Sequence, residues 1–169
     1  MTHPSDLLPL DHEGAGLILT PCPGIRGVEP RTALEQLKAA GADALITLMP
    51  ADEMTTNGVA DIADLCSQSG LQWFHLPIED EHAPEMDFAL AWQAQRLAVH
   101  RLLDEGRKIA LHCKGGSGRT GLMAALVLVE RGWSKDRAVT TVKALRPNAL
   151  SLRVHQDYVA ELAPAAPAG

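Results

Sequence analysis

One cysteine and one arginine stand at the two ends of a glycine-rich stretch. Residues 111–121 read LHCKGGSGRTG, so five residues separate Cys113 from Arg119. Apolar runs before and after this stretch indicate a strand, a loop and a helix. Such a loop directs backbone N–H groups and the positive end of a helix at one point. We therefore predict that it binds a tetrahedral oxyanion through Lys114, Gly115, Gly116, Ser117, Gly118 and Arg119.

Cys113 has the surroundings that a nucleophilic thiol requires. A helix N-terminus and a nearby cation lower thiol pKa values to roughly 3.5–7.5, which gives thiolate at neutral pH. Arg119 stays charged at any biological pH, and its planar fork of donors suits two phosphate oxygens, which a lysine cannot match. The two residue types predict attack by Cys113 on phosphorus while Arg119 holds the phosphate.

Two other interpretations of the stretch fit less well. A buried, unreactive cysteine beside a flexible loop does not account for the histidine, arginine and threonine that accompany it. The spacing of Gly116, Gly118 and Gly121 also matches a dinucleotide-binding fingerprint, with Asp136 at the distance of a ribose-binding acid. That acid should end a strand, whereas Asp136 follows Ser134 in what reads as the first turn of a helix.

The stretch resembles the signature His-Cys-x-x-Gly-x-x-Arg-Ser/Thr-Gly of the cysteine-dependent protein phosphatases. It is met by His112, Cys113, Gly116, Arg119, Thr120 and Gly121. The resemblance implies hydrolysis without metal or cofactor, through a phosphocysteine whose breakdown is assisted by a hydrogen bond from Thr120 to the sulfur. The segments 21–24, 77–80 and 146–149 extend the resemblance to the dual-specificity type, and in particular to the kinase-associated phosphatase group, over about residues 16–162.

The reaction also needs an acid, because an alkoxide or phenoxide leaves poorly unless a proton reaches it. The proline-bounded segment 77–85 carries four carboxylates, Glu79, Asp80, Glu81 and Glu85. Dual-specificity phosphatases have Pro-x-x-Asp some thirty residues before the cysteine, and Asp80 lies 33 residues before Cys113. The resemblance therefore favours Asp80 as general acid and later as base. The alternative is a solvated acidic loop without a catalytic role. The three neighbouring glutamates leave open which carboxylate of the segment is the acid.

Three further residues bear on the function. His112 is expected to orient the loop through backbone hydrogen bonds. Lys114 stands where phosphoinositide phosphatases also have lysine, but Ser117 replaces their second loop lysine. Gln156 resembles a glutamine that places the hydrolytic water in some relatives, but it is not part of the predicted site.

These residues predict a phosphoprotein phosphatase of the dual-specificity or tyrosine type. Its partners would be phosphorylated proteins or small phosphate monoesters. A phosphoinositide phosphatase and a catalytically weak phosphopeptide-binding module remain as alternatives. The combination of Cys113, Arg119 and Asp80 speaks against the binding module.

Length and composition indicate one domain over residues 1–163 and a flexible tail over 164–169, since 46% of the 169 residues are hydrophobic. A net charge of −6 without a basic block argues against nucleic-acid binding. The longest apolar run, 122–129, is too short to insert stably into a membrane. Three cysteines without scaffold spacing favour a reducing, cytoplasmic setting. The oligomeric state stays open.

Apolar periodicity predicts strands at 17–20, 43–49, 71–76 and 108–113. It predicts helices from a Thr32–Glu35 capping box to Gly41, then at 59–70, 86–105, 119–131, 134–145 and 151–162. In helix 86–105 the residues expected to face inward are Leu90, Ala94, Leu97, Ala98 and Leu102. Strands that alternate with helices predict an α/β fold with a central, mostly parallel twisted sheet and helices on both faces. The resemblance implies a protein tyrosine phosphatase-like fold.

Overall fold

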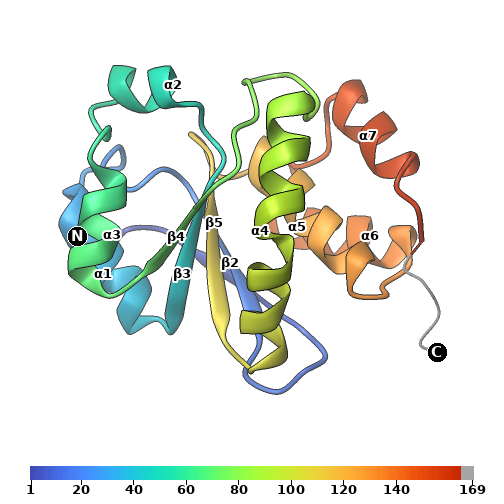
Figure 1. The fold of residues 1–169 in the computed structure, drawn as a ribbon, viewed down its shortest axis with the longest axis horizontal. Coiled ribbons are helices and arrows are strands. Elements are labelled where there is room, and N and C mark those ends of the chain that lie inside the picture. Colours follow the sequence, from blue (N-terminus) through green and yellow to red (C-terminus); the bar gives the residue numbers. More distant parts are fainter. Residues whose placement is uncertain (165–169) are drawn as a thin grey trace.

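A five-stranded sheet lies at the centre of the computed structural model, which describes residues 1–164 (Figure 1). Its strands, in the order β1-β2-β5-β3-β4, are β1 (Asp6–Pro9), β2 (Gly16–Thr20), β5 (Lys108–His112), β3 (Ala42–Thr47) and β4 (Gln72–His75). Only β1 is antiparallel to its neighbour. The predicted α/β class and the mostly parallel sheet are confirmed. Of the predicted tail, residues 165–169 lie outside the described residues.

Seven helices surround the sheet in the part of the chain that the structure describes. They are α1 (Pro30–Ala39), α2 (Ala51–Thr56), α3 (Ile62–Ser69), α4 (Met86–Asp104), α5 (Gly118–Glu130), α6 (Lys135–Leu145) and α7 (Arg153–Ala160). Figure 1 shows α1 and α3 on one face of the sheet and α4 and α5 on the other, with α6 and α7 beyond α5.

Side chains along each strand alternate between two apolar cores, as pleated strands require. Leu17 and Leu19 of β2 join the core that contains α4 and α5, whereas Ile18 joins the core that contains α1 and α3. In β5, Leu111 and Ala110 divide in the same way. Because both faces are covered, these strands read as continuous apolar runs.

The helix that follows the cysteine loop, α5, is buried from Arg119 to Val129. This explains why its sequence is apolar all round. Gly121 is required for its packing, because a Cβ there would lie 2.5 Å from the Cβ of Ala149. Arg146 donates to the carbonyl of Leu19 at 3.2 Å and so ties the segment after α6 to β2.

Several local predictions are wrong. Helix α1 begins at Pro30 with Glu29 as N-cap and no side-chain cap within the described chain, so the Thr32–Glu35 capping box is not used. Proline pre-forms the first helical turn and sets the earlier start. In α4, Leu90 is 60% and Leu97 73% exposed, and Ala94 is exposed too. The buried residues of α4 are instead Phe88, Trp92, Val99 and Leu103. The short elements β1 and α2 were not predicted.

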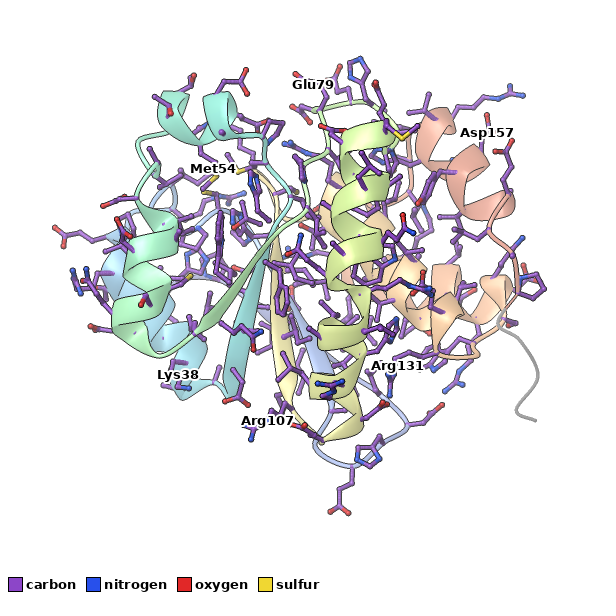
Figure 2. The ribbon with its side chains drawn as sticks, viewed as in Figure 1. Lys38, Met54, Glu79, Arg107, Arg131 and Asp157 are labelled. Carbon is purple, nitrogen blue, oxygen red and sulfur yellow. The ribbon has the colours of Figure 1, made fainter. Side chains whose placement is uncertain are left out.

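The four parallel strands all end at one edge of the sheet, at Thr20, Thr47, His75 and His112. Figure 2 shows Glu79 and Asp157 at this end of the molecule and Lys38 and Arg107 at the opposite end. Ligand sites of open α/β sheets form outside the carboxyl ends of the strands. No helix in residues 1–164 combines the length and the apolar character needed to cross a bilayer.

Candidate active site

The sulfur of Cys113 lies at the end of β5 and accepts two hydrogen bonds. The hydroxyl of Thr120 donates to Sγ at 3.1 Å, and the backbone N–H of Gly116 donates at 3.3 Å. Cys113 itself is 3% exposed. Burial raises the pKa of Cys22 and of Cys66 to about 12, so these thiols stay protonated.

Residues 114–117 wrap around this sulfur and leave amides free. The N–H groups of Lys114, Gly115 and Ser117 meet no protein acceptor within residues 1–164, and α5 begins directly afterwards. Gly116 has φ +81°, and a Cβ there would lie 2.6 Å from the backbone nitrogen of Pro21. The loop therefore needs glycine at this position to pack against the end of β2. Unpaired N–H groups at a helix N-terminus form a site for an anion.

Arg119 is held by a carboxylate that the sequence analysis missed. Its Nη1 and Nη2 donate to the two carboxylate oxygens of Glu53 at 2.9 and 2.8 Å, and Nη1 also donates to the carbonyl of Ile78 at 2.9 Å. The Nε edge of the guanidinium meets no acceptor within the described chain, so it can receive an oxyanion. Glu53 and Ile78 therefore occupy one edge of the guanidinium group, and the Nε edge is free within the described chain.

The charges around Arg119 keep it protonated. Burial opposes the charged form, but the hydrogen bonds that Arg119 donates to Glu53 and the charges of Cys113, Glu53 and Asp80 raise the pKa of Arg119 above its ordinary value. Arg119 is only 2% exposed. Glu53 belongs to the six-residue helix α2. The acidic run directly after β3 was the only signal in the sequence that could have pointed to it.

Asp80 lies beside Arg119, with 3.4 Å between its Oδ1 and Nη2 of the arginine. It sits in a tight turn: His82 donates through its backbone N–H to Glu79 at 3.1 Å and through Nδ1 to the carbonyl of Asp80 at 2.8 Å. Glu81 takes the left-handed φ of +62° in this turn. A non-glycine residue in that region is held there by its surroundings and is common at functional sites.

A cavity of about 460 Å³ brings these groups together. Its lining includes Cys113, Arg119 and Asp80, the loop residues Lys114, Gly115, Ser117 and Gly118, and also Ile25, Arg26, Leu152 and His155. Of the four acids in segment 77–85, Asp80 is the one in this lining. His155 was not predicted.

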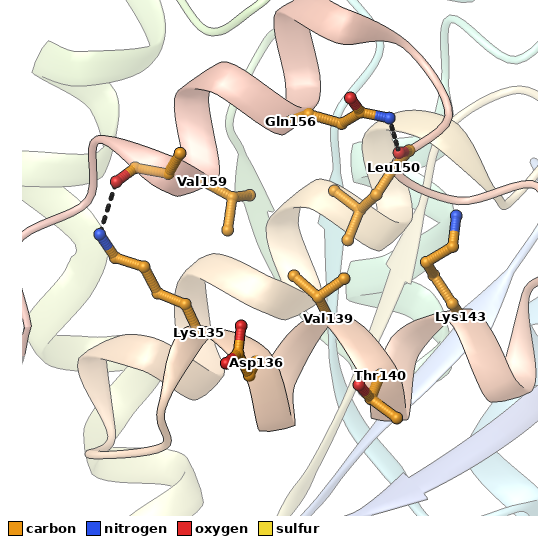
Figure 3. Close-up of a pocket in the computed structure, with 9 residues that line it drawn as sticks. Lys135, Asp136, Val139, Thr140, Lys143, Leu150, Gln156 and Val159 are labelled. Carbon is orange, nitrogen blue, oxygen red and sulfur yellow. Dashed lines mark hydrogen bonds between the residues drawn. The ribbon is translucent and has the colours of Figure 1, made fainter.

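A larger cavity of about 560 Å³ lies between α6 and α7 (Figure 3). Gln156 lines this second cavity and donates to the carbonyl of Leu150 at 3.0 Å. None of the predicted site residues lines it. Size alone therefore does not locate the site, and Gln156 belongs to a different part of the molecule.

His112 anchors the phosphate-binding loop through a chain of hydrogen bonds. Nδ1 faces the carbonyl of Cys113 at 3.0 Å, so Nδ1 carries the proton and Nε2 accepts from Thr47 at 2.8 Å. The indole of Trp73 in turn donates to Thr47 at 2.8 Å. Burial lowers the pKa of His112 to about 4, and the nearby charge of Arg119 acts in the same direction. The ring is therefore neutral at neutral pH.

This buried ring predicts a loss of stability in acid. An unfolded histidine binds its proton near pH 6.5, whereas the folded chain protonates His112 only near pH 4. Between these two pH values the unfolded state therefore binds more protons than the folded state. The contribution of His112 to the free energy of unfolding is complete above pH 6.5 and is lost as the pH falls toward 4. The shift corresponds to about 3 kcal/mol. Urea unfolding at pH 7 and pH 4.5 measures this loss of stability. Between the two pH values, a His112→Gln variant should lose less unfolding free energy than the unaltered protein. An equal difference in both proteins would contradict the assignment.

Comparison with known proteins identifies the fold and the family. Residues 25–133 match the family model Tc-R-P, described as "Polymorphic toxin system, DSP-PTPase phosphatase". Cyclin-dependent kinase inhibitor 3 of Rattus norvegicus is 31% identical over 148 residues, which are 82% of this chain and 68% of that protein. Tyrosine-protein phosphatase CDC14 of Saccharomyces cerevisiae is 30% identical over 79 residues, 46% of this chain and 14% of that protein.

Solved structures share the architecture. A kinase associated phosphatase whose catalytic-site cysteine is substituted by serine superposes with a TM-score of 0.81 at 23% identity, covering 95% of this chain and 94% of that one. PTPMT1 in complex with PI(5)P superposes with a TM-score of 0.62 at 18% identity, covering 92% and 95%. The predicted family and fold are confirmed, and the chain belongs to the DSP-PTPase phosphatases, which are cysteine-based hydrolases.

Proposed function

We propose that this chain hydrolyses phosphate monoesters on proteins through a phosphoenzyme at Cys113. The observation that supports this most is the arrangement in one cavity of Cys113, the unpaired amides of Lys114, Gly115 and Ser117, the free edge of Arg119 and the carboxyl group of Asp80. This arrangement supports a scheme in which each of these groups has one role and the chain's own residues supply the chemistry.

In the first step the sulfur attacks phosphorus, and the bond between phosphorus and the ester oxygen breaks. The phosphoryl oxygens lie against the amides of Lys114, Gly115 and Ser117 and against Nε of Arg119. These preorganised donors stabilise the charge that develops on the oxygens. Asp80 gives its proton to the leaving oxygen, which departs as an alcohol or phenol.

In the second step water attacks the phosphocysteine, and Asp80 takes up the water's proton. The bond between sulfur and phosphorus breaks, and the electron pair returns to the sulfur. The hydroxyl of Thr120, 3.1 Å from Sγ, stabilises the departing thiolate. Inorganic phosphate is released and the enzyme returns to its starting state.

Phosphorylated proteins are the proposed substrates because the cavity is open at the surface, with exposed Arg26 and Lys114 among its lining residues. Two cations at the rim suit an acidic segment beside the phosphate. The same cations keep a phosphoinositide as the second candidate. The three free cysteines favour a reducing cytoplasmic location.

Release of phosphate under a metal chelator tests this function. The substrates are a small aryl phosphate, phosphotyrosine and phosphothreonine peptides, and vesicles that contain a phosphoinositide. We expect turnover of the aryl phosphate and of at least one peptide. Turnover of the phosphoinositide alone would overturn the choice of substrate, and phosphate binding without any turnover would favour the binding module.

Arg119→Lys should act as a severe substitution. One ammonium group cannot pair with both oxygens of Glu53 and also offer an edge to phosphate. Loss of a charged hydrogen bond of about 1.5–3 kcal/mol corresponds to a fall in kcat/KM of roughly 10- to 150-fold. Arg137→Lys, on the exposed side of α6, serves as the control. A loss of less than about threefold would mean that Arg119 does not contact the phosphate.

A further inference from the structure

His155 is a buried histidine that the sequence signature does not include. It lies in α7, is 1% exposed and lines the cavity with Cys113 and Asp80. Its Cε1 lies 3.7 Å from the place that a Cβ of Gly118 would occupy, so the ring lies near this residue of the phosphate-binding loop. Helix α7 thus reaches the site through His155, and Leu152, its N-cap residue, also lines the cavity.

The hydrogen bond of His155 defines its protonation state. Nε2 lies 2.8 Å from the carbonyl oxygen of His82. A carbonyl only accepts, so Nε2 carries the proton, and Nδ1 of the neutral ring carries a lone pair. Nδ1 is buried and has no partner in the described chain. A second proton there would be buried without an acceptor, and burial is the largest cause that lowers the pKa of His155.

The carbonyl group that accepts from His155 lies in the same turn as Asp80. Inside the turn, His82 bonds to Glu79 and Asp80 as described above. At its start the turn is anchored by Ile78, whose N–H donates to Leu48 at 2.8 Å. The bond from His155 adds an anchor at the other end, beyond Asp80. The carboxyl group of Asp80 is itself 62% exposed, so its position depends on the backbone that carries it.

We propose that His155 is a positioning residue for the acid step, which holds the 79–82 turn from α7 so that the Asp80 carboxyl group stays beside Arg119 and above Cys113. This inference rests on the proposed function. It predicts that loss of the Nε2 donor impairs proton donation to the leaving group and leaves nucleophilic attack by Cys113 largely intact.

A double-mutant cycle with two substrates tests the proposal. His155→Leu and His155→Met remove the donor, whereas His155→Gln keeps an amide N–H. For an ester with a high-pKa leaving group, either apolar variant should lower kcat/KM about tenfold, and for an ester that leaves readily as an anion the loss in kcat/KM should stay below about twofold. His155→Gln should recover part of the lost activity. Either apolar variant suffices if the other does not fold.

The Asp80→Asn background separates this role from a packing role. Once the acid is gone its placement no longer matters, so His155→Met should add less than about twofold to the Asp80→Asn defect. Gln156→Met, the neighbour on α7 whose amide bonds to Leu150, should leave both substrates unaffected.

Two results would overturn the proposal: equal losses for both substrates, or full additivity with Asp80→Asn. Failure of the proposed function is distinguishable, because the unaltered protein would then turn over neither substrate.

Discussion

Cys113→Ser should lower turnover by roughly 10⁴-fold or more while phosphate or vanadate still binds. A serine hydroxyl ionises far less readily than a thiol and is a poor nucleophile without an adjacent base. The groups that bind the oxyanion remain, because the amides of Lys114, Gly115 and Ser117 and the Nε edge of Arg119 do not bond to the sulfur. Steady-state hydrolysis of an aryl phosphate gives the first quantity, and calorimetric titration with phosphate gives the second.

Cys66→Ala provides the matched control. Cys66 belongs to α3 and is fully buried, and burial raises the pKa of its thiol to about 12. The folded fraction of this variant should keep its activity. Turnover by Cys113→Ser close to that of the unaltered protein would rule out the covalent scheme.

Asp80→Asn should slow hydrolysis of esters with high-pKa leaving groups by about 10²- to 10⁴-fold, the usual range for general acid catalysis. Asparagine keeps the size of the side chain but cannot donate the proton. Esters whose leaving groups depart readily as anions need little protonation, so their loss should be smaller. A series of aryl and alkyl phosphates measures this as a steeper dependence of kcat/KM on leaving-group pKa.

Glu79→Gln and Glu81→Gln are the controls, since both residues share the turn with Asp80 but do not line the cavity. Each should retain the leaving-group dependence of the unaltered protein. If either glutamine variant acquires the steeper dependence while Asp80→Asn does not, the cysteine mechanism survives and Asp80 is not the acid.

The sequence predicted the groups that share one local stretch, because their spacing follows directly from the chain. Residues 113–120 form the loop and the first turn of α5, so a contiguous motif describes the sulfur, the amides and Thr120. The apolar strands and the apolar stretch 122–129 of α5 were also predictable, because deep burial leaves a strong signal in hydrophobicity.

What the sequence missed depends on contacts between distant segments. Glu53 pairs with Arg119 across 66 residues, and His155 reaches His82 across 73. Helix α4 shows a second limit: it carries two apolar stripes, and only packing decides that Trp92 lies inward and Leu97 outward. Periodicity predicts the spacing of apolar residues along a helix, but it does not show which of two apolar stripes is buried.

The phosphoenzyme itself offers the most direct test of the account. An Asp80→Asn variant mixed with a reactive aryl phosphate should form the intermediate quickly and hydrolyse it slowly, because the carboxylate that activates water is missing. Rapid acid quench followed by peptide mass spectrometry should then place one phosphoryl group on Cys113, with a burst of phenol that matches the enzyme concentration. A phosphoryl group on another residue, or turnover without any burst or phosphoenzyme, would contradict the central claim.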